Sequence, residues 1–133
     1  MSNLSNVMLI DDDELTNHIH KSVISKLDGV SHIRVYSDAN QALSFLKNLS
    51  EEDHGFPDCI FLDINMPKMN GWDFLDVYQN LPAHASRLFV LTSSIDQVDK
   101  TKAQSYTCVS GFISKPLKLD VLEELLQVDT YWT

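Results

Sequence analysis

Five short runs with strand-like composition alternate along the chain with five segments of helical periodicity, and this alternation constrains the fold more than any other feature. The runs cover residues 7–10, 32–36, 59–64, 88–91 and 111–114. The first, third and fourth runs are continuously apolar, which is typical of strands buried on both faces of a parallel sheet. The second run alternates polar and apolar residues, and this pattern favours the edge of a sheet.

The segments between the runs place apolar residues at helical spacing. The first segment predicts a helix that ends at Asp28-Gly29 and buries the repeat of Leu15, Ile19, Val23 and Leu27. The other segments predict helices over residues 38–49, 71–81, 95–106 and 119–126. Strand–helix units of this length imply parallel strands joined by right-handed crossovers, with helices on both faces of the sheet. We therefore expect one α/β domain over residues 1–133, built as a doubly wound parallel sheet.

The composition suits a folded domain without a basic or membrane-seeking surface. Hydrophobic residues make up 44% of the chain, and its net charge is −9. An acidic chain of this kind lacks the basic stripe that nucleic acid requires, and an anionic membrane surface would repel it. Cys59 and Cys108 form no CxxC pair, and no apolar run is long enough to span a membrane. We therefore expect a cytoplasmic protein that binds neither nucleic acid nor membranes.

Polar side chains stand at the ends of four of the five expected strands. Asp11 and Asp12 follow the first strand, Asp63 follows the apolar part of the third, Thr92 follows the fourth and Lys115 follows the fifth. The carboxyl ends of parallel strands meet at one edge of the sheet, where ligands of doubly wound folds bind. We therefore expect these five residues to form one site.

The three carboxylates of this expected site require a neutralising partner. Two like charges about 4 Å apart repel by roughly 4 kcal/mol at an effective dielectric of about 20. Either a proton or a divalent cation would relieve this repulsion. Oxygen ligands alone favour Mg²⁺, with Mn²⁺ as a substitute on the same ligands. The Lys115 ammonium, the Thr92 hydroxyl and a carboxylate nucleophile are the groups needed to hold and accept a phosphoryl group, and Asp63 is the central candidate.

Four motifs carry a resemblance to a known family. They are Leu9-Ile10-Asp11-Asp12-Asp13, Phe61-Leu62-Asp63-Ile64-Asn65-Met66-Pro67 followed by Asn70-Gly71, Val90-Leu91-Thr92-Ser93, and Gly111-Phe112-Ile113-Ser114-Lys115-Pro116. Through them, residues 7–128 resemble the receiver domains of two-component response regulators, of the stand-alone, CheY-like type. The resemblance implies a flavodoxin-like (βα)5 fold with strand order 2-1-3-4-5. It also implies a cis peptide bond between Lys115 and Pro116.

The resemblance further implies how the acidic residues would work. Asp63 would accept a phosphoryl group from a phosphohistidine on a sensor histidine kinase or a histidine phosphotransfer protein. Asp12, Asp63 and the backbone carbonyl of Asn65 would bind Mg²⁺ directly, and Asp11 would bind it through water. The protein would then be a signalling switch and not an enzyme, since it would catalyse only its own phosphorylation and slow dephosphorylation.

The same resemblance assigns the switch. Lys115 would contact the phosphoryl oxygens, and Thr92 would move toward the phosphoryl group. Phe112 would turn inward as Thr92 moves. The surface made by the fourth helix, fifth strand and fifth helix would change for an unknown downstream protein. The protein would be a monomer or a phosphorylation-dependent dimer.

Three other functions stay open at this point. A metal-dependent phosphohydrolase would need a cap domain, for which 133 residues leave no room, and an acid–base Asp two residues after its nucleophile, where this chain has Asn65. A flavin or nucleotide carrier would need a phosphate-binding loop after the first strand, where this chain has four acids. A degenerate receiver would act as a binding module alone.

The histidines and the last tryptophan complete the set of residues that carry chemistry. The histidines are His18, His20, His32, His54 and His84. They show no metal-site spacing and are expected at the surface. Trp132 lies beyond the last apolar repeat, where it could cover the sheet edge, join a dimer interface or stand exposed at an excised boundary.

Overall fold

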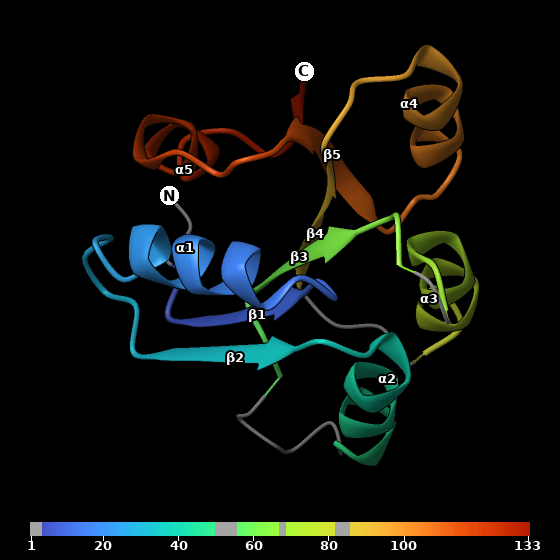
Figure 1. Cartoon of the computed structure of the whole chain (residues 1–133), viewed down its shortest axis with the longest axis horizontal. Helices are drawn as coiled ribbons and strands as arrows, with labels where there is room; N and C mark the ends of the chain where they lie inside the picture. Colours follow the sequence, from blue (N-terminus) through green and yellow to red (C-terminus); the bar gives the residue numbers. More distant parts are fainter. Residues whose placement is uncertain (1–3, 50–55, 67–68, 82–85) are drawn as a thin grey trace.

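The computed structural model describes residues 4–49, 56–66, 69–81 and 86–133, and within these ranges five helices cover a six-stranded parallel sheet (Figure 1). The strands are β1 (Asn6–Ile10), β2 (His32–Tyr36), β3 (Cys59–Asp63), β4 (Arg87–Thr92), β5 (Val109–Ser114) and β6 (Tyr131–Trp132). The helices are α1 (Glu14–Ile24), α2 (Ala39–Asn48), α3 (Gly71–Tyr78), α4 (Gln97–Gln104) and α5 (Leu119–Leu125). Pro67, His54 and His84 lie outside the described residues.

The strand order is β2-β1-β3-β4-β5-β6, and all five pairings are parallel. The predicted flavodoxin-like sheet of order 2-1-3-4-5 is therefore confirmed, with one further strand at its β5 edge. The peptide bond between Lys115 and Pro116 is cis, as the resemblance implied. No helix in the described ranges is long and apolar enough to cross a membrane.

The apolar runs form central strands because their successive side chains enter cores on opposite faces of the sheet. Met8 and Ile60 pack with side chains of α2, α3 and α4, whereas Leu9 and Phe61 pack with those of α1 and α5. All four side chains are at most 1% exposed. The half-exposed β2 lies at the edge of the sheet, as its alternating pattern predicted.

Helix α1 differs from its predicted burial at its start, whereas Val23, Ile24 and Leu27 at the other end of the apolar repeat pack on the core as expected. Leu15 is 68% exposed and Ile19 is 44% exposed, whereas Asn17 and His20 are buried with Ile24. The helix also ends at Ile24 rather than at Asp28-Gly29. The two polar side chains turn inward because both have hydrogen-bond partners there, which compensates for their burial. The expectation that all histidines lie at the surface is therefore wrong for His20, although His18 and His32 are exposed.

Helix α4 is shorter than predicted and its apolar stripe is exposed. It spans Gln97–Gln104 instead of residues 95–106, and of its residues only Ala103 is buried. Ile95 is 48% exposed and Val98 is 74% exposed. The helix packs on the core through Ala103, and the ammonium of Lys102, one turn after Val98, lies 4.7 Å from the centre of the Trp72 ring.

The sixth strand, β6, was missed because two residues carry no periodic pattern. It extends the sheet beyond β5, with Phe112 paired to Trp132. Both the backbone N–H and the hydroxyl of Thr133 donate hydrogen bonds to the carbonyl of Phe112. Gly111 permits this close approach, because a Cβ there would collide with the Tyr131 carbonyl oxygen. Of the three interpretations of Trp132, the structure therefore shows the first: it covers the sheet edge and packs on the core.

Candidate functional site

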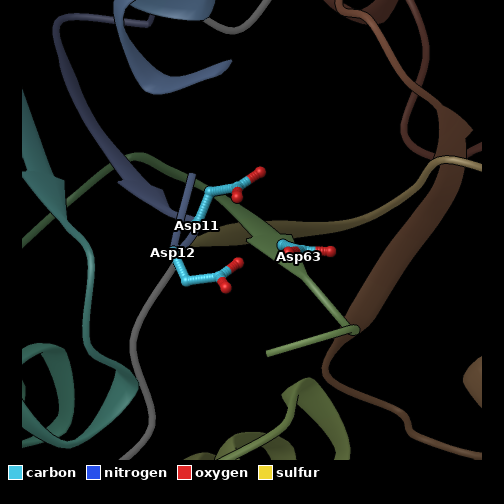
Figure 2. A group of neighbouring side chains, drawn as sticks. All are labelled: Asp11, Asp12 and Asp63. Atoms are coloured by element: carbon cyan, nitrogen blue, oxygen red, sulfur yellow. The ribbon is translucent and has the colours of Figure 1, made fainter. Parts of the chain in front are cut away.

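Three carboxylates converge at the carboxyl end of the sheet, as their positions in the sequence predicted. Asp11 and Asp12 directly follow β1, and Asp63 is the last residue of β3. Each can offer one carboxylate oxygen such that the three atoms lie within 4.8 Å of one another (Figure 2). Asp11 and Asp63 are each 2% exposed, whereas Asp12 faces solvent. The cluster is thus buried on one side and open on the other.

Backbone hydrogen bonds hold the two buried carboxylates in place. The N–H of Asp13 donates to Asp11 Oδ1 at 3.0 Å, and the N–H of Asn65 donates to Asp63 Oδ1 at 3.1 Å. Asp13 itself caps α1 by accepting hydrogen bonds from two N–H groups of its first turn. The loop after β1 therefore orients Asp11, and the loop after β3 orients Asp63.

Helix α3 begins directly against the strand that carries Asp63. The N–H of Gly71 donates to the carbonyl of Ile64 at 3.1 Å. A Cβ on Gly71 would lie 2.6 Å from Ile64 Cα and 3.0 Å from the carbonyl oxygen of Asp63. The Asn70-Gly71 turn therefore needs glycine for close packing against the backbone of the nucleophile candidate.

Lys115 lies between the two buried carboxylates. Its Nζ is 2.7 Å from Asp11 Oδ2 and 3.2 Å from Asp63 Oδ1. Its backbone N–H donates to the carbonyl of Thr92 at 2.7 Å, which ties the end of β5 to the end of β4. With Asp12, the cluster holds three carboxylates and one ammonium, so it keeps a net negative charge when all four groups are ionised.

The environment shifts the pKa values of two members of the cluster. Burial raises the pKa of Asp63 above its usual value, the charge of Asp11 adds to this, and the Asn65 N–H and Lys115 partly oppose it. Burial alone would lower the pKa of Lys115, but its hydrogen bond to Asp11 and the nearby carboxylate charges outweigh burial and raise it. Lys115 therefore stays cationic at neutral pH.

A cavity of about 470 Å³ opens above these groups. Asp11, Asp12, Asp63, Asn65 and Lys115 line it together with Ser93 and residues of α1. Carboxylate, carbonyl and water oxygens are the ligands that hard divalent cations prefer. The donor set therefore fits a cation of this class with an oxyanion beside it.

Two expected members of the site lie apart from the cluster. The hydroxyl of Thr92 donates to the carbonyl of Ser94 at 2.8 Å and accepts from its N–H at 3.3 Å, so it is bonded to its own loop. Phe112 on β5 is already fully buried in the core, so the structure does not show the outward position from which the resemblance would have it turn inward. Sequence reasoning placed Thr92 correctly at the strand end but could not give the direction of its hydroxyl.

Two polar residues near the site were missed as contributors. Asn17 and His20 on α1 are buried, and each hydrogen-bonds to a loop that carries a charged member of the cluster. Their spacing of three residues on a helix that follows an acidic loop was the available signal. This signal was missed because the apolar repeat of the same helix, which begins at Leu15 and Ile19, indicated a different buried face.

Comparisons with known proteins agree with the fold. A family model described as the response regulator receiver domain matches residues 7–127. The crystal structure of a two-component response regulator from Cytophaga hutchinsonii is 31% identical and superposes with a TM-score of 0.85, covering 95% of this chain and 96% of that one. The response regulator Rcp1 from Synechocystis sp. is 27% identical over 130 residues, which are 95% of this chain and 87% of that protein.

Other relatives are much longer than this chain. The osmosensing histidine protein kinase SLN1 from Saccharomyces cerevisiae is 27% identical over 113 residues, which cover 83% of this chain but 9% of the kinase. The chain likewise spans less than half of the transcriptional regulatory protein DcuR from Escherichia coli, at 48% of its length. The residues that the family model matches include the acidic cluster and Lys115. The chain belongs to the response regulator receiver domain family of two-component systems.

Proposed function

We propose that this protein is a phosphorylation-dependent switch in which Asp63 accepts a phosphoryl group from a phosphohistidine. A carboxylate oxygen of Asp63 attacks phosphorus, and an O–P bond forms as the P–N bond to the donor imidazole breaks. The phosphohistidine would be carried by a sensor histidine kinase or a histidine phosphotransfer protein. The observation that carries the proposal is the position of the Lys115 Nζ, within 3.2 Å of Asp63 in an open, oxygen-lined cavity.

The residues fit a Mg²⁺ ion as cofactor, with Mn²⁺ as a substitute. Asp12, Asp63 and the backbone carbonyl of Asn65 would bind it directly, and Asp11 would bind it through water. Bound there, the ion would offset charge on the phosphoryl oxygens. The fit rests on the net negative charge that Lys115 leaves uncompensated in the cluster.

The output of the switch would begin at Thr92. Its hydroxyl now bonds to Ser94, so contact with a phosphoryl group on Asp63 would require this bond to break. Phe112 lies on the neighbouring strand, two residues before Ser114, the register partner of Thr92. A change there would alter the surface of α4, β5 and α5 for a downstream protein, with the protein as a monomer or a phosphorylation-dependent dimer. A cytoplasmic location stays a prediction.

The chemistry would stop at self-phosphorylation and slow self-dephosphorylation, without turnover of other substrates. The competing phosphohydrolase function would use an acid–base carboxylate two residues after Asp63. Asn65 stands at that position and carries no titratable group. The carrier function would need a phosphate loop after β1, where acids lie instead.

The test is phosphorylation by a small donor. The protein is incubated with acetyl phosphate and Mg²⁺, and its intact mass is measured. We expect one phosphoryl adduct, which disappears with Asp63→Asn or with chelation of the metal, and which remains with Asp13→Asn as the matched control. Absence of an adduct on the unaltered chain, or an adduct on Asp63→Asn, would contradict the proposal. Multiple turnover of phosphate esters would favour the phosphohydrolase.

A further inference from the structure

The buried face of α1 carries two polar side chains before it reaches the apolar Ile24. Asn17 is 4% exposed and His20 is 1% exposed, and they lie one turn apart on the helix. Leu15 and Ile19 on the same helix are exposed instead. At its start, the helix therefore buries Asn17 and His20 instead of Leu15 and Ile19.

Each of these side chains is bonded to a loop that supplies one partner of the central ion pair. Asn17 Nδ2 donates to the backbone carbonyl of Asp11 at 2.7 Å. His20 Nε2 accepts a hydrogen bond from the N–H of Leu117 at 3.1 Å. Asp11 and Lys115 form the 2.7 Å ion pair, and Leu117 follows Lys115 by two residues. One face of α1 therefore bonds both to the loop that carries Asp11 and to the loop that carries Lys115.

The segment from Lys115 to Leu117 is held at both ends. At its start, the N–H of Lys115 donates to the carbonyl of Thr92 at 2.7 Å. At its end, the N–H of Leu117 donates to His20. His20 also lines the same cavity as Lys115 and the acidic cluster. Two hydrogen bonds therefore fix the backbone at the two ends of the segment that carries Lys115.

The hydrogen bonding of His20 is unfavourable for stability alone. Because Nε2 accepts, the neutral ring carries its hydrogen on Nδ1, and this atom is buried without a partner among the described residues. Burial lowers the pKa of His20, which keeps the ring neutral and Nε2 available as an acceptor. An apolar side chain would avoid the unsatisfied Nδ1–H but would leave the buried N–H of Leu117 without its acceptor. What His20 supplies is therefore the hydrogen bond to the loop after β5.

We propose that His20 is a positioning residue, which fixes the loop after β5 so that the Lys115 ammonium is held at the acceptor carboxylate. The inference rests on the proposed role of Asp63 and Lys115, and it adds a residue of α1 to that site. His20 itself touches neither the phosphoryl group nor the donor; it acts through Leu117 and Lys115.

The first test compares three variants of the full chain by their rate of phosphorylation with acetyl phosphate and Mg²⁺. We expect His20→Leu, which removes the acceptor, to slow the reaction about tenfold, since small misplacements of a reacting group cost rate steeply. His20→Gln should restore most of the rate, because its Oε1 can accept the same N–H. His18→Leu, an exposed change on the same helix, is the matched control and should leave the rate unchanged.

A double-mutant cycle separates positioning from a general structural effect. In a Lys115→Ala background, His20→Leu should slow phosphorylation no further, because the group that it positions is gone. An equal slowing by His20→Leu with and without Lys115 would overturn the proposal. So would an unchanged rate in His20→Leu on its own.

A second measurement does not depend on phosphorylation. In NMR spectra of the unmodified protein, His20 should show a protonated Nδ1 and an accepting Nε2, and the Lys115 Cε signal should shift in His20→Leu and return in His20→Gln. An unmoved Lys115 signal would contradict the positioning role even if Asp63 is phosphorylated normally. If the unaltered chain takes up no phosphoryl group, the proposed function fails, and the Lys115 signal alone then decides whether His20 positions it.

Discussion

The middles of the strands and their carboxyl ends differ sharply in what they bury. In the middle of the sheet, Phe61 and Phe89 stack with ring centres 5.7 Å apart and are fully buried in an apolar core. Two residues further along β3, Asp63, which bears a carboxyl group, is only 2% exposed. Within a single strand, the middle therefore stabilises the fold through apolar burial, whereas a buried charge at the end costs stability.

The fold tolerates buried carboxylates at the strand ends because these groups are partly paired. Lys115 offsets part of the charge of Asp11 and Asp63, and backbone N–H groups satisfy one oxygen of each. This pairing is incomplete, since three carboxylates face one ammonium. The strand middles are therefore expected to respond strongly to truncation and weakly to ions and pH, and the strand ends to behave in the opposite way.

The largest effect is expected in a strand middle. Phe61→Ala should lower the free energy of unfolding by about 3–5 kcal/mol, because it removes a fully buried ring and leaves a cavity. Chemical denaturation followed by circular dichroism measures the change. Leu15→Ala removes an apolar side chain that is 68% exposed and should change the same quantity by at most about 0.5 kcal/mol. A loss in Phe61→Ala no larger than in Leu15→Ala would break the distinction between core and surface.

The same contrast explains which parts of the fold were predictable. The runs that became β1, β3 and β4 are apolar on both faces, so their composition alone indicated central strands. The strand order 2-1-3-4-5 came from the family resemblance. The inner face of α1 was predicted wrongly at its start, because Leu15 and Ile19 keep helical spacing although they lie outside. There His20 bonds to Leu117, 97 positions away in the chain, and such a partner leaves no periodic pattern. The two residues of β6 are likewise recognisable only through their pairing with β5.

The site was predictable in its members and less so in its geometry. Topology places every strand end at one edge, so the convergence of Asp11, Asp12, Asp63 and Lys115 followed from their positions in the chain. The direction of the Thr92 hydroxyl did not follow, because it depends on a local bond to Ser94. Tertiary contacts decide such details, and a single sequence does not record them.

The second effect concerns the strand ends and a divalent cation. At ten times its dissociation constant, Mg²⁺ should raise the free energy of unfolding by about 1.4 kcal/mol, because it binds the folded carboxylate cluster and not the unfolded chain. Thermal unfolding with and without Mg²⁺ measures the shift. Asp12→Asn should reduce it, whereas Phe61→Ala should retain it at lower overall stability. An equal Mg²⁺ effect in Asp12→Asn would mean that the cation binds elsewhere.

The smallest effect has the opposite sign to the first. Asp63→Asn should raise the free energy of unfolding by about 1 kcal/mol at pH 7, as expected when a functional buried charge is removed. The pKa of Asp63 is raised in the folded protein, mainly by burial, so its protonated form favours folding. The stabilisation that comes from protonating Asp63 is fully present below pH 3.8, the ordinary pKa of the carboxyl group. It is lost as the pH rises through the raised pKa of the folded protein. The gain from Asp63→Asn should therefore be present at pH 7 and vanish at low pH. Asp13→Asn, at an exposed helix cap, should show no such gain, and a destabilised Asp63→Asn at pH 7 would show that the Asp63 charge supports the fold.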